Sequence, residues 1–169
     1  MRIDPDPYGA EFGMLLQYLD YQRETLLSKT DGLTRAQLTQ KHFPSELTLA
    51  GLLYHLALVE EDWMENRFAG LPDREPWASV DWDADPYWEF RTAALLEPVQ
   101  LQGRYREACN RSRDVVSKST GLEQLSVKGL RDGRHFSLRW VLLHLVEETA
   151  RYAGHADFLR EAIDGTVGE

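Results

Sequence analysis

The sequence has a single cysteine and no long apolar run, and each shortage excludes a class of protein. Cys109 has no second cysteine with which to form an intramolecular disulfide, and no CxxC spacing exists, which favours a reducing compartment. No apolar stretch approaches the roughly 20 residues that a transmembrane helix requires. The first residues, MRIDPDPYGAEFG, carry acids and prolines where a signal peptide needs a basic start and an apolar segment. We therefore expect a cytoplasmic protein that is not inserted in a membrane.

Basic residues are also scarce relative to acidic ones. The chain has 19 Lys and Arg against 28 Asp and Glu, for a net charge of −9. Binding to nucleic acid or to anionic lipid requires a basic surface, so we expect neither as a partner. The 169 residues are 43% hydrophobic and 28% charged, a balance typical of an ordinary globular protein. This length predicts one domain over residues 1–169.

Apolar residues recur at the spacing of one helix face in four long segments, and no segment has a convincing strand pattern. The first helix is predicted over residues 9–29, with a short connecting turn of helix at 34–40. The second begins after Thr48, whose hydroxyl suits an N-cap, and stops by Pro72, because proline cannot continue a helix. The apolar stripe of this second helix consists of Leu49, Leu52, Leu56, Val59 and Trp63.

A long connection, residues 72–96, separates the second helix from the third and is acidic and rich in tryptophan. The fourth helix is predicted from Leu138, after an N-cap at Ser137, to Ile163. Four long amphipathic helices with one long connection predict an all-α four-helix bundle, with the crossover between helices two and three. The third helix is predicted over 97–119, with the core candidates Val99, Tyr105, Cys109 and Val116.

Ligand-capable side chains gather on one edge of the fourth helix. His144, Glu148, Tyr152 and His155 follow one another at spacings of 4, 4 and 3 residues, which places them within an arc of roughly 80°. A buried carboxylate is costly without a partner, so Glu148 needs a cation, a metal or a hydrogen-bond network. On the second helix, His55 lies on the apolar stripe and points partly inward. A metal or catalytic site is one interpretation; a hydrogen-bonded core histidine and a solvated helix face are the other.

These same stretches resemble the DinB-like superfamily. LTLAGLLYHLALVEEDW (47–63) and FSLRWVLLHLVEETARYAGHADFLREAIDG (136–165) carry the pattern, and LLQYLDYQRETLLSKTDGLTRAQL and YREACNRSRDVV are similar to its actinobacterial branch. The resemblance implies a four-helix bundle, often a homodimer, with a metal bound by three side chains. These are a histidine of helix two and two residues at i and i+4 on helix four. In the related mycothiol-dependent maleylpyruvate isomerases, the latter are a glutamate and then a histidine, and the metal is zinc.

Carried over by position, the resemblance implies the ligands His55, Glu148 and Tyr152. Tyr152 departs from the pattern, because a tyrosine with a pKa of about 10 is a poor zinc ligand. His144, one turn before Glu148, is one replacement. His155 lies about 10.5 Å along the helix axis from Glu148, too far for the two to grip one ion easily. A third alternative retains only His55 and Glu148, with Tyr152 hydrogen-bonded to Glu148. The expected metal is zinc, with nickel or iron as alternatives.

The resemblance implies an enzyme, a metal-dependent transferase or isomerase that uses a low-molecular-weight thiol such as mycothiol or bacillithiol on a small-molecule substrate. A divalent cation would lower the pKa of a coordinated thiol or water. Trp77, Trp82 and Trp88 of the crossover are expected either to cover the pocket or to pack in the core. The alternative function is a non-catalytic, small-ligand-binding or stress-related protein with a degenerate metal site, which the loss of a ligand at Tyr152 favours. A structural dimerisation module is a third.

Overall fold

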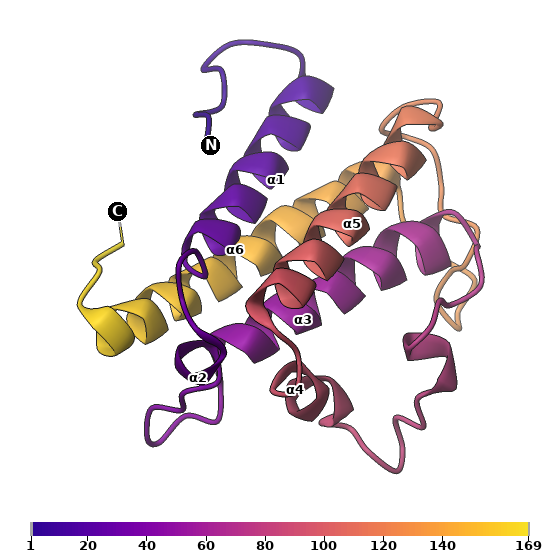
Figure 1. Ribbon diagram of the computed structural model, residues 1–169. Coiled ribbons are helices and arrows are strands. Elements are labelled where there is room, and N and C mark those ends of the chain that lie inside the picture. The colour runs from indigo at the N-terminus through magenta and orange to yellow at the C-terminus, as the bar shows by residue number, and fades with distance from the viewer. Residues whose placement is uncertain (1, 169) are drawn as a thin grey trace.

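The protein is described by a computed structural model covering residues 2–168. Its four long helices are α1 (Glu11–Ser28), α3 (Leu49–Glu60), α5 (Pro98–Ser117) and α6 (Leu138–Asp164) (Figure 1). Within residues 2–168 there is no strand, and a single isolated bridge pairs Leu125 with Ser137. The predicted all-α fold is therefore confirmed. No helix in the described part of the chain combines the length and the apolar character needed to span a bilayer.

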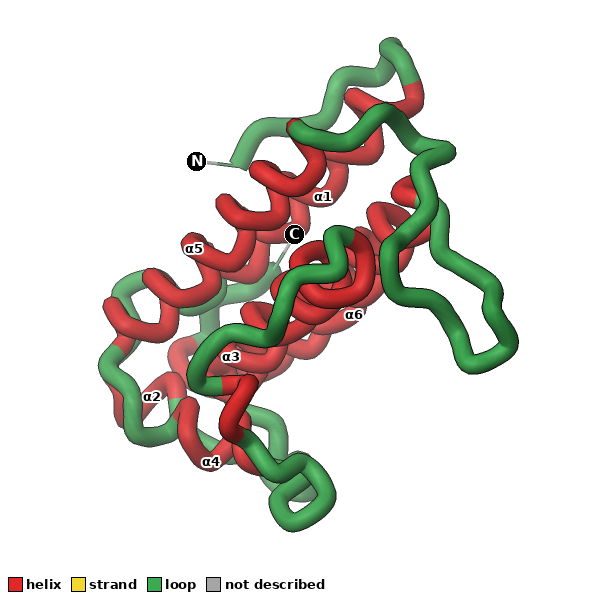
Figure 2. Tube along the Cα trace, turned by 90° about the vertical axis from the view of Figure 1, so that its right-hand side faces the viewer, coloured by secondary structure: helices red, strands yellow, loops and turns green. Residues whose placement is uncertain are grey.

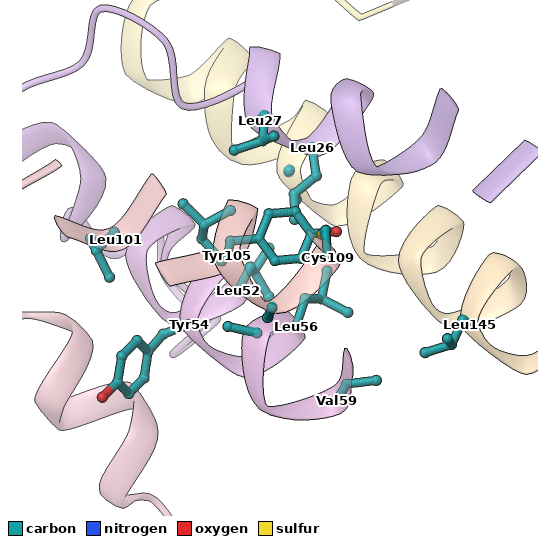
Figure 3. Close-up of a cluster of buried hydrophobic side chains, with 14 of the residues drawn as sticks. Leu26, Leu27, Leu52, Tyr54, Leu56, Val59, Leu101, Tyr105, Cys109 and Leu145 are labelled. Atoms are coloured by element: carbon teal, nitrogen blue, oxygen red, sulfur yellow. The ribbon is translucent and has the colours of Figure 1, made fainter. Parts of the chain in front are cut away.

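The bundle is held together by contacts of α1 with α6 and of α3 with both α5 and α6. Figure 2 shows these helices together, with the long connections running around them. The aromatic ring of Tyr105 lies among leucines of α1 and α3 at the centre of the core (Figure 3). Tyr54 points away from this centre, toward the crossover. Burial of this apolar surface is the main favourable contribution to folding.

The helix ends follow the capping residues that the sequence contains. The Thr48 hydroxyl accepts a hydrogen bond from the Gly51 amide at 3.1 Å, and the Ser137 hydroxyl accepts one from the Trp140 amide at 3.2 Å. Each satisfies a first-turn amide that has no partner within its own helix. α6 ends where Gly165 adopts a left-handed conformation with φ of 77°, which glycine enters without steric cost.

The predicted second helix continues beyond α3 with a different winding. From Glu61 to Phe68 the chain forms a π-helical segment, η1, a rare form that is often found at functional sites. Glu60, just before it, bonds to Arg23 of α1, whereas Glu61 pairs with Arg111 of α5. Consecutive residues point about 100° apart around a helix, so the two carboxylates reach different arginines.

The prediction that Val99 of α5 lies in the core is wrong. Val99 is 76% exposed, whereas Tyr105, Cys109 and Val116 are buried as expected. Val99 precedes the buried Leu101 by two residues, which is about 200° around a helix. It therefore faces away from the core.

The crossover between α3 and α5 contains short helical segments and packs against α3. It includes a 3₁₀ turn, η2 (Trp77–Ser79), and a short helix, α4 (Trp88–Ala93). α4 packs against α3. The Phe90 ring of α4 occupies the space that a side chain at Gly51 would fill, since a Cβ there would lie 2.4 Å from Phe90 Cδ1. A further short helix, α2 (Arg35–Leu38), links α1 to α3.

Candidate functional site

The imidazole of His55, in the middle of α3, has a carboxylate at each ring nitrogen. Nδ1 is 2.9 Å from Glu89 Oε1, a hydrogen bond, and Nε2 is 3.8 Å from Glu148 Oε1, an ion-pair contact. The three side chains are mostly buried, with 19%, 8% and 17% of their surfaces exposed for His55, Glu89 and Glu148. The structure thus brings together the two residues that the sequence placed at the centre of the site, His55 and Glu148, and adds a second carboxylate.

His144 joins this group from α6. Its Nε2 lies 2.8 Å from Glu148 Oε2, and its ring contacts Trp63, with centroids 4.4 Å apart, and the nearly parallel Trp140, at 5.2 Å. Both His55 Nε2 and His144 Nε2 are buried without a hydrogen bond of good geometry. Buried polar atoms normally have a partner. Two imidazole nitrogens that face one carboxylate without hydrogen bonds are a donor set that suits a divalent cation.

The nitrogen and oxygen atoms of this cluster do not surround one point at which a metal ion would sit. Within residues 2–168, no three His, Cys, Asp or Glu side chains stand at positions from which they would hold a metal ion as they are. Binding an ion would therefore require one of the imidazoles to turn. The two imidazoles differ in this respect, because His55 is hydrogen-bonded at Nδ1 to Glu89, whereas His144 contacts only Glu148 among the carboxylates.

The other two candidates on α6 occupy different places. Tyr152 packs edge-on against the His55 ring, with centroids 5.0 Å apart. Burial, reinforced by the charge of Glu148, raises the pKa of its phenol, so the hydroxyl stays protonated at neutral pH and is a poor metal ligand. His155 is exposed and contacts the Tyr152 ring at 5.6 Å. The structure thus groups His55, His144 and Glu148, with Tyr152 beside them and His155 outside.

The electrostatics of the cluster follow from its carboxylates. Burial alone would lower the pKa of His55, but its contacts with Glu148 and Glu89 outweigh burial and raise that pKa to about 9. The interaction with His55 in turn lowers the pKa of Glu148, against the effect of burial. Without a metal, the site at neutral pH is a cationic imidazolium between two carboxylates.

Glu89 is the member of the site that sequence reasoning missed. It lies on α4, in the crossover, where no periodicity reveals which side chains point inward. The available signal was local, an acidic residue between two aromatic ones, Trp88 and Phe90. Aromatic neighbours that pack onto a helix bury the residue between them, and a buried carboxylate needs a partner.

A cavity of about 330 Å³ opens beside His55, between the α3–η1 helix and the crossover. Trp77 and Trp82 line it, whereas Trp88 packs against both of them, at 5.9 and 6.3 Å, without lining it. Two of the three crossover tryptophans thus border the pocket. The rest of the wall has an apolar part, with Leu58, Val59, Trp63 and Pro72, and a polar, mostly acidic part, with Glu61, Asp62, Glu65, Asn66, Asp73 and Arg74.

Arginines fix the acidic wall of the cavity. Arg111 of α5 pairs with both buried carboxylates of η1, with Glu61 and, at 2.9 Å, with Glu65. From the crossover, Arg74 Nε donates to Glu65 at 3.0 Å and Trp77 Nε1 donates to Glu61 at 2.9 Å. The crossover is therefore attached to η1 by charge-assisted hydrogen bonds, which hold the cavity in shape.

The one cysteine of the chain does not belong to this site. Cys109 is 2% exposed in the core. Burial, with the nearby charge of Glu60, raises the pKa of its thiol to about 12. A thiol with such a pKa is inert at neutral pH, so any thiol chemistry requires a thiol from outside the protein.

Taken together, these features define a helical bundle with a histidine–carboxylate cluster beside a cavity, the place where bundles hold metals and cofactors. Comparison with protein families specifies the class further. The sequence profile of the mycothiol-S-transferase family matches residues 14–165. The chain belongs to the mycothiol S-transferase family, and the resemblance to thiol-dependent DinB-like proteins is confirmed. No protein of curated function matches the chain.

Proposed function

We propose that the protein is a transferase that joins the thiol of mycothiol to an electrophilic small molecule in the cavity beside His55. The observation that carries this proposal is the placement of His55 at the cavity wall with a carboxylate at each nitrogen. In the reaction, the thiol loses its proton to a carboxylate of the cavity wall. The sulfur then forms a bond to the electrophilic carbon, and the leaving group departs with the electrons of the bond that breaks.

The wall of the cavity suits a hydroxyl-rich thiol. Mycothiol carries sugar and inositol rings, whose hydroxyls donate hydrogen bonds to carboxylates. Asp62 and Asp73 also line the cavity and are more exposed than Glu61 and Glu65. The indoles of Trp77 and Trp82 offer apolar faces on which such rings pack.

We further propose that the site binds a divalent metal, with zinc before nickel or iron. His55, Glu148 and His144 would hold it, a choice supported by the two buried Nε2 atoms that lack hydrogen bonds. When bound, such an ion lowers the pKa of a thiol at an open coordination position. The protonated phenol of Tyr152 would border the metal as a hydrogen-bond donor rather than a ligand.

The test is turnover by protein purified without chelator, with mycothiol and monobromobimane as substrates and with elemental analysis of the same sample. We expect His55→Ala to lose activity by about 100-fold or more, the range typical of a group acting in the reaction, together with its metal. His42→Ala is the matched control, because His42 lies in the loop before α3. Equal rates for His55→Ala and wild type would overturn the proposal.

The metal proposal has its own test in Tyr152→His, which restores the third ligand of the family pattern. Because the ring of residue 152 already packs on His55, we expect zinc to bind at least about 10-fold more tightly, measured against a competing chelator. An unchanged zinc affinity would show that the donor set is wrong.

The second candidate function is a mycothiol-binding protein without catalysis. Tyr152, in place of a metal ligand, favours it. It predicts that calorimetry detects mycothiol binding to wild-type protein while no conjugate forms with any electrophile.

A further inference from the structure

We propose that Glu89 is a positioning residue, which holds the imidazole of His55 so that Nε2 faces Glu148. Glu89 lies on α4, so the proposal gives the crossover a functional role in addition to that of the bundle helices. Its meaning for catalysis rests on the proposed function, but the positioning itself concerns the orientation of one ring and is measured without turnover.

Glu89 and Glu148 contact different nitrogens of the His55 ring and therefore have different roles. Glu89 is at Nδ1, 2.9 Å away, and Glu148 is at Nε2. These nitrogens lie on opposite edges of the imidazole, so one ion cannot sit at Nε2 and also reach Glu89. When Nδ1–H donates to Glu89, the neutral ring is fixed in the tautomer that has its lone pair on Nε2. Nε2 is then the nitrogen available to a ligand or a proton.

The surroundings of Glu89 point to a role at the site rather than in folding. Its side chain is 8% exposed, and Oε2 is buried without a hydrogen-bond partner. A carboxylate with one buried oxygen unsatisfied costs stability, and an apolar side chain of similar size would avoid that cost. The compensating contact is the one with His55.

The neighbouring residue fixes the approach of Glu89. Phe90 stacks on the His55 ring, with centroids 6.0 Å apart and planes 18° apart, and rests against Gly51. His55 is therefore held by stacking on its face and by hydrogen bonding at its edge, both from α4. Metal-bound histidines commonly donate the second ring N–H to a carboxylate that orients them.

The test uses two substitutions that differ in one property. Glu89→Gln retains an oxygen that accepts from Nδ1–H, whereas Glu89→Leu removes the acceptor and keeps the volume. In metal-free protein labelled with ¹⁵N-histidine, we expect a downfield, slowly exchanging His55 Nδ1–H signal in wild type and in Glu89→Gln. We expect its loss in Glu89→Leu. Glu75→Gln, at an exposed glutamate of the same crossover, is the control and should leave the signal unchanged.

Zinc affinity gives a second readout. Loss of an orienting partner typically costs 10- to 100-fold in metal affinity, so we expect about that loss in Glu89→Leu and less than about 10-fold in Glu89→Gln. A Glu89→Leu protein that retains both the signal and the affinity would overturn the proposal. So would a Glu89→Gln protein that loses zinc as completely as His55→Ala, because Glu89 would then be a ligand itself. Absence of transferase activity in wild type, with the signal pattern as expected, would refute only the proposed function.

Discussion

At the scale of single residues, the site is governed by how many charges meet in a small, partly buried volume. His55 bears a proton because Glu89 and Glu148 face its two nitrogens. The metal-free cluster of these three groups then has a net charge of −1, and a divalent cation that displaces the proton makes it neutral. If a metal binds as proposed, it would compete with the proton for the same nitrogen, Nε2.

The carboxylate contacts of His55 predict a pH dependence of stability. The pKa of His55 is raised from 6.5 to about 9 on folding, so its stabilising contribution is complete below pH 6.5 and is lost as the pH rises through about 9. In chelator-treated protein, urea unfolding should show a free energy of unfolding that falls from pH 7 to pH 10 more steeply in wild type than in His55→Gln. Parallel curves for the two proteins would contradict the assignment. Zinc affinity should rise over the same range.

At the scale of elements, a π-helical segment and a short crossover helix shape the site. The π-helical η1 places Glu61 and Glu65 together at the cavity wall, where Arg111 pairs with both. The short helix α4 presents Glu89 to His55. The second of these depends on close packing, because α4 approaches α3 at a glycine.

Gly51→Ala therefore should displace α4. The new Cβ would lie 2.4 Å from Phe90 Cδ1, too close for any real contact, and overpacking of this kind typically costs about 1–3 kcal/mol. We expect a lower free energy of unfolding and loss of the downfield His55 signal. Gly103→Ala is the matched control, since a Cβ at this α5 position meets nothing within 4 Å. It should stabilise the helix by about 0.5–1 kcal/mol. Equal stability of the two variants would contradict the packing argument.

At the scale of the whole molecule, a buried ion pair joins three of the four long helices. Arg23 of α1 donates to both oxygens of Glu60 on α3, at 2.7 and 2.6 Å, and Ser112 of α5 donates to Glu60 at 2.6 Å. Arg23 is 3% and Glu60 1% exposed. The α1 helix packs most closely against α6, and this network attaches it to α3 and α5 as well.

Arg23→Met should strongly destabilise the bundle, because removing one member of a buried pair leaves an uncompensated charge, at a typical cost of about 3–5 kcal/mol. The double variant Arg23→Met/Glu60→Leu should recover much of this loss. Arg113→Met is the control, since Arg113 pairs with Asp20 at 2.9 Å on the surface, and exposed pairs contribute at most about 1 kcal/mol. Urea unfolding that shows Arg23→Met as stable as Arg113→Met would contradict this account.

The homodimer stays a prediction, for which light scattering is the measurement.

Patterns along the chain are sufficient to predict the bundle and half of the site. Helical periodicity locates the four long helices, because a helix buries one stripe whatever it packs against. Local caps at Thr48 and Ser137 set two of their starts. His55 and Glu148 follow from the same logic, since a polar group on an inward face needs a partner and facing helices supply one.

The remaining members of the site depend on how the elements pack in three dimensions. His144 turns toward Glu148 while His155 is exposed, although both lie on the same edge of α6. Spacing along α6 already favours His144, one turn from Glu148, but it does not reveal the Trp63 ring of η1 that packs against His144. Glu89 reaches His55 from 34 residues away because a crossover without periodicity folds back onto Gly51. Contacts of this kind arise from packing between elements, which a pattern along the chain does not encode.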